Sequence, residues 1–224
     1  RNTQKHQDMK RRAFNLIILF GLVSLFGDIA YEGARSVNGP YLKLFAVHAT
    51  TLVIIAVLGE FLGYALRLLS GYLSDKTKSY WFLTFLGYGM LISVPLLSLT
   101  GIWQIAALFI ILERIGKAIR SPARDTMLSQ VSSRVGTGFG FGLHEAMDQI
   151  GAVAGPLIFT AIFVLIGKHQ IGITEYQKGY AFLWIPFALV MLCLVIACRR
   201  VPRPDALEAA TEKVKTSDNL SRLF

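Results

Sequence analysis

The sequence predicts an all-α membrane protein with six transmembrane helices. Three observations favour this class: 54% of the 224 residues are hydrophobic, the mean hydropathy is +0.52, and apolar runs of about 20 residues recur along the chain. About 20 residues is the length at which an α-helix crosses the hydrocarbon core of a bilayer. The net charge of +9 does not favour a nucleic-acid partner, because the basic residues lie mostly between the apolar runs.

A separate feature of the sequence supports each expected span. The first run is too long for a signal peptide and is expected to be retained. The second and third are separated by a short basic loop, the fifth follows a glycine-rich stretch, and the sixth contains Cys193 and Cys198, whose spacing suggests neither a disulfide framework nor a metal site. The expected spans are residues 13–38, 50–71, 80–99, 102–121, 139–166 and 180–198.

The fourth span needs a separate argument, because its apolar part, residues 102–112, is only half the required length. Thr100-Gly101 is a turn signal, and the span before it is already complete. The fourth helix must therefore extend forward through Glu113, Arg114 and Lys117. Charges inside a span are costly and mark functional candidates by default.

The distribution of basic residues predicts that both termini are cytoplasmic. Sixteen of the 23 lysines and arginines fall on one face of the six-span arrangement. This divides the chain into a cytoplasmic amino-terminal segment (1–12), a six-helix bundle (13–198) and a cytoplasmic linker or tail (199–224), with a short amphipathic helix around 206–214.

Ionisable residues follow a pattern that repeats after three spans. They occur in the first, second, fourth and fifth spans, whereas the third and sixth have none and each contains one proline. A three-plus-three inverted repeat, as found in many transporters, accounts for this pattern. The uncharged third and sixth spans are expected to be peripheral.

Polar side chains recur at helical spacing on four spans, so that on each span they share one face. Asp28, Glu60, Arg114 and Asp148 fall at similar, central depth, and unpaired charges there cost several kcal/mol. We expect either pairing or a carboxyl group that holds a proton, as proton coupling requires; structural ion pairs between helices are the alternative. The candidate substrate and proton pathway is Asp28, Glu32, Arg35, Glu60, Tyr64, Arg114, Lys117, His144 and Asp148.

Within this set, Arg114 is expected to be the central cation, which attracts an anionic solute group or tunes a carboxylate. Asp28, Glu32 and Glu60 are the candidate proton sites. A second set of small residues should permit close helix packing. It comprises Gly59, Gly63, Gly151, Gly155 and Pro156.

The loop Gly71-Tyr-Leu-Ser-Asp-Lys-Thr-Lys78 resembles the signature loop of the major facilitator superfamily, Gly-x-Leu-Ala-Asp-Arg-x-Gly-Arg. Lys78 replaces its second glycine. Arg114 falls where the family has Arg-x-x-Gln-Gly in the fourth span, and Gly151-x-x-x-Gly155-Pro156 resembles a fifth-span motif of exporters. The resemblance covers residues 13–200.

This resemblance implies the amino-terminal six-helix half of a secondary transporter, working by alternating access in a prokaryotic inner membrane. It also implies a cytoplasmic charge latch between the two halves of such a protein. The expected gate residues are Gly71, Asp75, Lys76, Arg120, Arg124 and Asp125.

The expected partners are the lipid bilayer, a small-molecule solute, protons and a second six-helix half, supplied by a longer chain, which we favour, or by a homodimer. The competing hypothesis is a membrane interaction module that docks on a partner and transports nothing. His144-Glu145-Ala-Met-Asp148 resembles a zinc-protease motif, but Asp replaces the second histidine and no third ligand is evident. No metal, cofactor or enzymatic activity is therefore expected.

Overall fold

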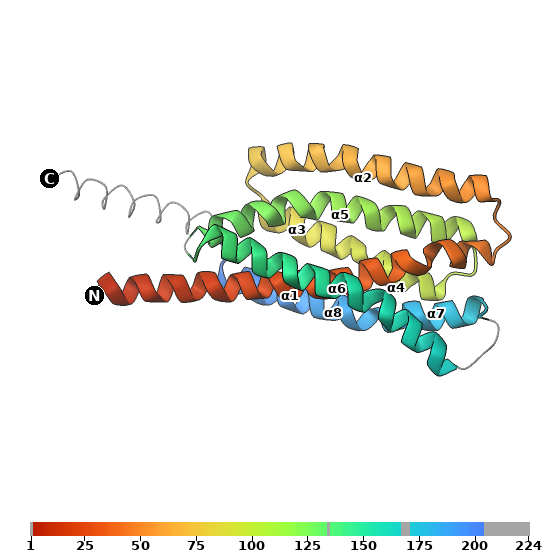
Figure 1. Cartoon of the computed structure of the whole chain (residues 1–224). Coiled ribbons are helices and arrows are strands. Elements are labelled where there is room, and N and C mark those ends of the chain that lie inside the picture. The colour runs from red at the N-terminus through yellow and green to blue at the C-terminus, as the bar shows by residue number, and fades with distance from the viewer. Residues whose placement is uncertain (1, 134, 167–170, 204–224) are drawn as a thin grey trace.

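The computed structural model describes residues 2–133, 135–166 and 171–203, and all regular secondary structure in these ranges is helical. The helices run side by side in one bundle (Figure 1). Four are continuous and two are interrupted. The elements are α1 (Asn2–Lys43), α2 (Ala49–Thr77), α3 (Tyr80–Gly89), η1 (Met90–Ile92), α4 (Ser93–Leu96), η2 (Leu97–Leu99), α5 (Trp103–Ser132), α6 (Thr137–Ile166), α7 (Ile173–Phe182) and α8 (Trp184–Arg200).

The predicted class, an all-α membrane protein, is confirmed. Five helical segments of the described chain are long and apolar enough to cross a membrane: Lys10–Lys43, Ala49–Thr77, Tyr80–Leu99, Thr137–Ile166 and Ile173–Arg200. The sixth, α5, has 30 residues, which correspond to about 45 Å, but its charges exclude it by composition. As expected from the length argument, this helix continues through Glu113 and Lys117.

Several predicted helix boundaries differ from the structure, including the start of the sixth span at Ile173 instead of residue 180. One helix begins at Asn2 and runs through the expected boundary at residue 13, because the intervening sequence contains no glycine or proline. Helix α2 continues to Thr77, and α5 continues to Ser132 instead of ending near residue 121. The proposed helix around 206–214 lies outside the described residues.

Helix α5 passes through Pro122 without ending. Proline has no N–H to donate to the carbonyl four residues earlier, here that of Ala118. The hydroxyl of Ser70 on α2 donates a 2.8 Å hydrogen bond to this carbonyl oxygen. The neighbouring helix thus satisfies the backbone group that the proline leaves unpaired, as polar groups inside a membrane require.

The other two prolines of interest lie where helices are interrupted. Pro95 lies in α4, between two short 3-10 segments, and Pro186 lies in the first turn of α8. Pro186 cannot donate to the carbonyl of Phe182, the last residue of α7. The third and sixth spans are therefore segmented at their prolines.

Two apolar cores hold the bundle together. Helix α1 packs mainly against α6 and α8, and α5 packs mainly against α2 and α3. One core includes Tyr41, Tyr88 and Tyr180, and the other, nearer the amino-terminal end of α1, includes Phe20 and Met127. Helices α1 and α5 lie next to each other at the centre of the bundle.

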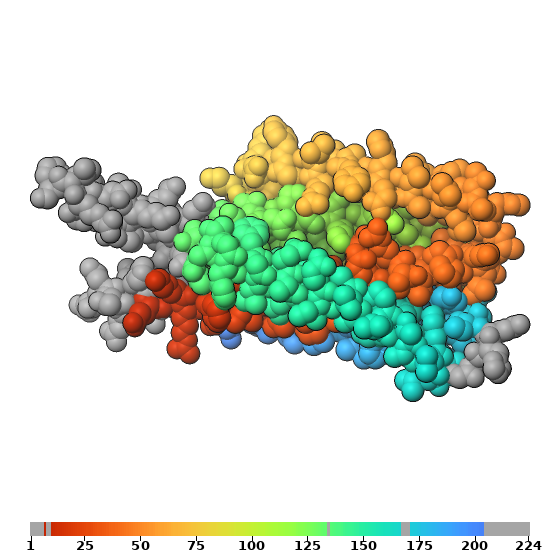
Figure 2. Space-filling model, in the orientation of Figure 1, coloured from red at the N-terminus to blue at the C-terminus, as the bar shows by residue number. Residues whose placement is uncertain are grey.

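The most exposed helices are not the expected ones. Within the most apolar window of each span, 11% of α2 and 17% of α6 are buried, against 44% for Tyr80–Leu99 and 33% for Ile173–Arg200. The uncharged third and sixth spans pack closely on α5 and α1, whereas α2 stands out from the bundle (Figure 2).

The start of α1, the α2–α3 loop and the end of α8 lie at the same end of the bundle (Figure 1). The indole N–H of Trp81, at the start of α3, donates to the carbonyl oxygen of Val201, just after α8, at 3.1 Å. A chain that crosses the bilayer an even number of times has both of its ends on the same side, as observed here. The cytoplasmic location of this end remains a prediction.

Candidate functional site

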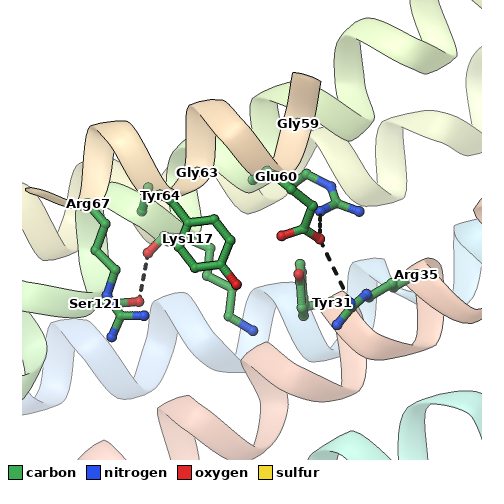
Figure 3. A pocket seen from close by; sticks show the side chains of 11 residues that line it. Tyr31, Arg35, Gly59, Glu60, Gly63, Tyr64, Arg67, Lys117 and Ser121 are labelled. Atoms are coloured by element: carbon green, nitrogen blue, oxygen red, sulfur yellow. Dashed lines mark hydrogen bonds and ion pairs between the residues drawn. The ribbon is translucent and has the colours of Figure 1, made fainter. Parts of the chain in front are cut away.

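A cavity of about 210 Å³ opens between α1, α2 and α5 (Figure 3). The surface in this region is hollowed, with α5 at its floor (Figure 2). Of the predicted pathway residues, the structure brings five into its wall. The lining consists of Tyr31, Arg35, Gly59, Glu60, Gly63, Tyr64, Arg67, Arg114, Lys117, Ala118 and Ser121.

Glu60 is the carboxylate of this cavity, and it joins three helices. Its Oε1 atom forms an ion pair with Arg114 of α5 and lies 3.8 Å from Nη2 of Arg35 of α1. The Arg114 side chain is 14% exposed, whereas those of Glu60 and Arg35 are 44% and 51% exposed. Two guanidinium groups from different helices therefore share one carboxylate oxygen.

Lys117 is held by groups of α1. Its Nζ lies 3.6 Å from the ring centroid of Tyr31, which places the ammonium over the aromatic face. The same atom lies 3.9 Å from Oδ1 of Asp28 and 3.9 Å from Oε1 of Glu32. Glu32 also pairs with Arg35, at 3.4 Å. The predicted stripe on the first span thus meets the charged face of the fourth.

Cations outnumber carboxylates in the cavity wall. Arg35, Arg67, Arg114 and Lys117 line it, and Glu60 is the one carboxylate among the lining residues. Low-dielectric walls concentrate the field of such an imbalance inside a cleft. The arrangement can attract and hold an anion.

A second polar cluster lies deeper, between α1, α3, α5 and α6. Ser24 donates a hydrogen bond to Oδ1 of Asp148. Nη1 of Arg124 donates to the hydroxyl of Ser24 at 3.3 Å and to that of Tyr88 at 3.4 Å. Asp28, which is 6% exposed, lies beside Asp148. Asp148 and Asp28 therefore belong to this cluster, and Asp28 connects it to Lys117.

Within the described part of the chain, the predicted gate residues of α5 form no ion pair with Asp75. Asp75 is exposed near the end of α2, and it has no ion pair within the described part of the chain. Arg120 is 2% exposed, with its guanidinium carbon 4.5 Å from the ring centroid of Tyr88. Because α5 continues to Ser132, residues 120–125 lie inside the helix instead of at its end.

Of the other gate residues, Asp125 on α5 contacts α2, whereas Gly71 and Lys76 lie on α2 itself. Asp125 forms a 3.8 Å ion pair with Arg67, and it also accepts hydrogen bonds from its neighbour Arg124. A Cβ atom at Gly71 would lie 3.8 Å from Cβ of Pro122, in ordinary contact. Lys76 lies 5.7 Å from the ring centroid of Tyr72.

The glycines predicted for packing differ from one another. A Cβ atom at Gly155 would lie 2.6 Å from the backbone nitrogen of Gly33, and one at Gly151 would overlap the carbonyl oxygen of Leu25, so α6 approaches α1 backbone to backbone. Pro156 lies within α6, one residue after Gly155, and its carbonyl accepts a hydrogen bond from Thr160 at 3.0 Å.

The two glycines of α2 have other surroundings. A Cβ atom at Gly59 would lie 2.6 Å from Cδ of Arg114, so this glycine makes room for the arginine side chain. At Gly63, in contrast, there is open space, and the residue lines the cavity instead of packing against a helix. The prediction of helix packing at Gly63 therefore differs from the structure.

His144 is buried, with 4% exposure, and neither ring nitrogen has a hydrogen-bond partner among the described residues. Within residues 2–133, 135–166 and 171–203, no group of three or more His, Cys, Asp and Glu side chains is placed to hold a metal ion. The resemblance to a zinc-protease motif thus gains no third ligand from the structure.

Three residues of the site escaped the sequence analysis. Tyr31 holds Lys117, Tyr88 covers Arg120, and Ser70 satisfies the carbonyl of Ala118. Tyr31 lies four residues before Arg35 and could have been found by extending the stripe of the first span. Ser70 could have been found by asking what pairs with the carbonyl freed by Pro122. Tyr88 gave no signal, because its partners come from another helix.

Apolar helices long enough to cross a bilayer, packed around an ionic interior, define a multi-pass membrane protein. Residues 13–222 match the family model of the Major Facilitator Superfamily. The chain belongs to this family. Membership of a transporter family points to a non-enzymatic protein and does not favour the alternative of a non-transporting interaction module.

Two relatives illustrate the similarity. An uncharacterized protein of Mycobacterium tuberculosis is 38% identical over 197 residues, which cover 88% of this chain and 47% of the relative. An uncharacterized MFS-type transporter of Methanocaldococcus jannaschii is 29% identical over 170 residues, covering 75% of this chain and 42% of the relative. The chain thus spans about half the length of these relatives. No solved structure matches.

Proposed function

We propose that this chain forms one half of a secondary transporter that moves a small solute across the membrane by alternating access. The observation that carries the proposal is the cavity between α1, α2 and α5, in which Glu60, Arg114 and Lys117 form ion pairs across helices. Charged groups inside a bundle are costly unless they pair or serve a pathway. Pairs that bridge helices can be exchanged when the helices or a solute move.

The packing of the helices supports an inverted three-plus-three repeat. The first span, α1, packs on the fifth and sixth, and the fourth span, α5, packs on the second and third. If each span of the first three corresponds to the span three positions later, the contacts of the first span become those of the fourth. This is the relationship expected for the two inverted units of such a transporter.

Exposed apolar side chains support a second six-helix half as a partner. On α2, Phe61 and Leu68 are 66% and 79% exposed, and on α6, Ile150 and Val153 are 59% and 61% exposed. These helices flank the hollow seen in Figure 2. A second half, in the same chain or in a second copy, would cover part of this surface and close the cavity.

The buried carboxyl groups support proton coupling. Asp28 is 6% exposed, and a carboxylate buried to this degree inside a membrane bundle must be paired or hold a proton. Asp28 also lies within 3.9 Å of Lys117, which contacts the cavity. Glu32 contacts the same lysine and Glu60 lines the cavity, so Asp28, Glu32 and Glu60 remain the proposed proton sites.

The test is solute-dependent proton flux into vesicles that contain the complete protein, measured with an internal pH dye and a panel of anionic, cationic and neutral metabolites. We expect the Asp28→Asn, Glu32→Gln, Glu60→Gln triple variant to lose the proton flux. Glu145→Gln is the matched control, because Glu145 is exposed and bonds only to Gln149 of its own helix. Unchanged coupling in the triple variant would contradict the proton-site assignment.

A further inference from the structure

We infer that Arg35 and Arg114 form a subsite for an anionic group of the solute, a carboxylate or a phosphate, and that Glu60 occupies this subsite when the solute is absent. The inference rests on the proposed transport function and adds the chemical class of the solute. Three observations carry it: the shared oxygen of Glu60, the charge balance of the cavity, and the free space beside Glu60.

The geometry at Glu60 is that of a carboxylate bound by arginines. Its Oε1 atom is shared by Arg114 of α5 and by Arg35 of α1. Figure 3 shows Glu60 and Arg35 facing each other. Guanidinium groups bind carboxylates and phosphates through several parallel N–H donors, and one shared oxygen leaves most of those donors without a carboxylate partner. A free anion with two or three oxygens can satisfy more of them than Glu60 does.

The charge balance selects an anion over a cation. Without Glu60, the lining residues of the cavity would present four cations and no carboxylate. The two nearest acidic side chains are already engaged: Asp28 is 6% exposed, and Glu32 lies 3.4 Å from Arg35 and 3.9 Å from Lys117. A cationic solute that displaced Glu60 would leave Arg114 without its carboxylate partner, whereas an anion replaces the charge that Glu60 supplies.

Glu60 has room to leave the subsite. Its side chain is 44% exposed, and it lies on α2, the least buried of the candidate spans. Among the described residues, no atom of another helix lies within 4 Å of the Cβ position at Gly63, almost one turn further along. Arg114 cannot retreat in the same way, because its side chain is 14% exposed and packs against Gly59. The exchange thus moves the carboxylate and leaves the arginine in place.

The test uses the complete protein with Glu60→Ala, which empties the subsite without adding a competing group. We expect acetate or inorganic phosphate, at constant ionic strength against chloride, to raise the Tm of this variant in a saturable manner. In the wild type the same anions should act at least about 10-fold more weakly, because Glu60 competes for the two arginines.

Two further variants make the result specific. Glu60→Ala combined with Arg114→Gln should lose the response to acetate and phosphate, whereas Glu60→Ala combined with Lys43→Gln should keep it, because Lys43 is exposed at the end of α1 and does not line the cavity. An equal response in the Arg114 double variant, or no response beyond chloride in Glu60→Ala, would overturn the inference.

This binding measurement is independent of transport. Saturable stabilisation by acetate or phosphate without solute flux in vesicles would support the anion subsite and count against the transport proposal. Flux of only neutral or cationic solutes, with no anion response in Glu60→Ala, would support the transport proposal and count against the anion subsite.

Discussion

The guanidinium carbon of Arg120 lies 4.5 Å from the ring centroid of Tyr88, and the arginine is 2% exposed. Arg120 Nη1 also lies 3.5 Å from the carbonyl oxygen of Gly87. An arginine so completely buried is stabilised by the aromatic face and by the buried Glu113, on which Arg120 acts electrostatically. This arrangement predicts a structural role for Arg120, separate from that of the cavity arginines.

Replacing Arg120 by methionine should therefore destabilise the protein by about 2 to 4 kcal/mol, because it removes the cation and leaves the Glu113 carboxyl without it. The measurement is thermal unfolding of the complete protein in detergent, followed by tryptophan fluorescence. Arg67→Met is the control; its side chain is 55% exposed, and its loss should cost at most about 1 kcal/mol. Equal Tm values for the two variants would refute the structural role.

Close contact between α1 and α6 predicts that Gly155→Ala destabilises the bundle. A Cβ atom there would lie 2.7 Å from the carbonyl oxygen of Ile29 and 2.6 Å from the nitrogen of Gly33, so the two backbones must separate. We expect a loss of about 1 to 3 kcal/mol, as for other overpacked positions. Gly142→Ala, on the same helix but in open space, should be neutral or stabilising by up to about 1 kcal/mol. Comparable unfolding temperatures for both would show that the helices are not in close contact.

The hydrogen bond from Ser70 to the carbonyl of Ala118 predicts a coupling between Ser70 and Pro122. Ser70→Ala should cost about 1 to 2 kcal/mol, because it leaves a buried carbonyl unpaired. In a Pro122→Ala background the alanine N–H can pair with that carbonyl, and the cost of Ser70→Ala should fall below about half of its original value. A double-mutant cycle of unfolding free energies measures this coupling, and strict additivity would exclude it.

Exposure in the cavity predicts how single cysteines react with a membrane-impermeant maleimide. The native cysteines, Cys193 and Cys198, would first be replaced by serine. A cysteine at Tyr64, which is 69% exposed, should be labelled, whereas one at Asp28, which is 6% exposed, should be labelled at least about 10-fold more slowly. Tyr88→Cys, at 1% exposure, is a second protected control. Rapid labelling at position 28 would indicate a conformation more open than the one described here.

The sequence predicted the helices better than their surroundings, for a physical reason. Hydropathy and length define a span, so the third span (Tyr80–Leu99) was predicted with its observed limits, and the passage of the fourth through Glu113 followed from arithmetic. Spacing along one helix also placed Asp28 and Glu32 on one face. These are local properties, which the sequence contains directly.

The partners of those faces are not local. Whether Arg120 meets the Asp75 loop or the ring of Tyr88 depends on where the helix ends and how it is rotated against α3, and neither follows from its own sequence. The opposite charges of Asp75 and Arg120 can be read from the sequence. The contact between Arg120 and Tyr88 depends on how α5 packs against α3, which the sequence of one helix does not contain. For the same reason Gly63 was assigned to packing although it lines an open cavity.

The charges of helix α5 also affect how the protein is inserted into the membrane. Of the six expected spans, it alone is too rich in charge to be a membrane helix by its own composition within the described chain, and two of its charges, Arg114 and Lys117, are paired with α2 and α1. A translocon that sorts segments by their own hydrophobicity rejects such a segment, since each central arginine or lysine costs about 2.5 to 3.5 kcal/mol. Its entry into the bilayer then depends on α1 and α2 having arrived first. The ion pairs of the cavity would thus link insertion to the proposed function, because Glu60, which pairs with Arg114 of α5, also lines the cavity.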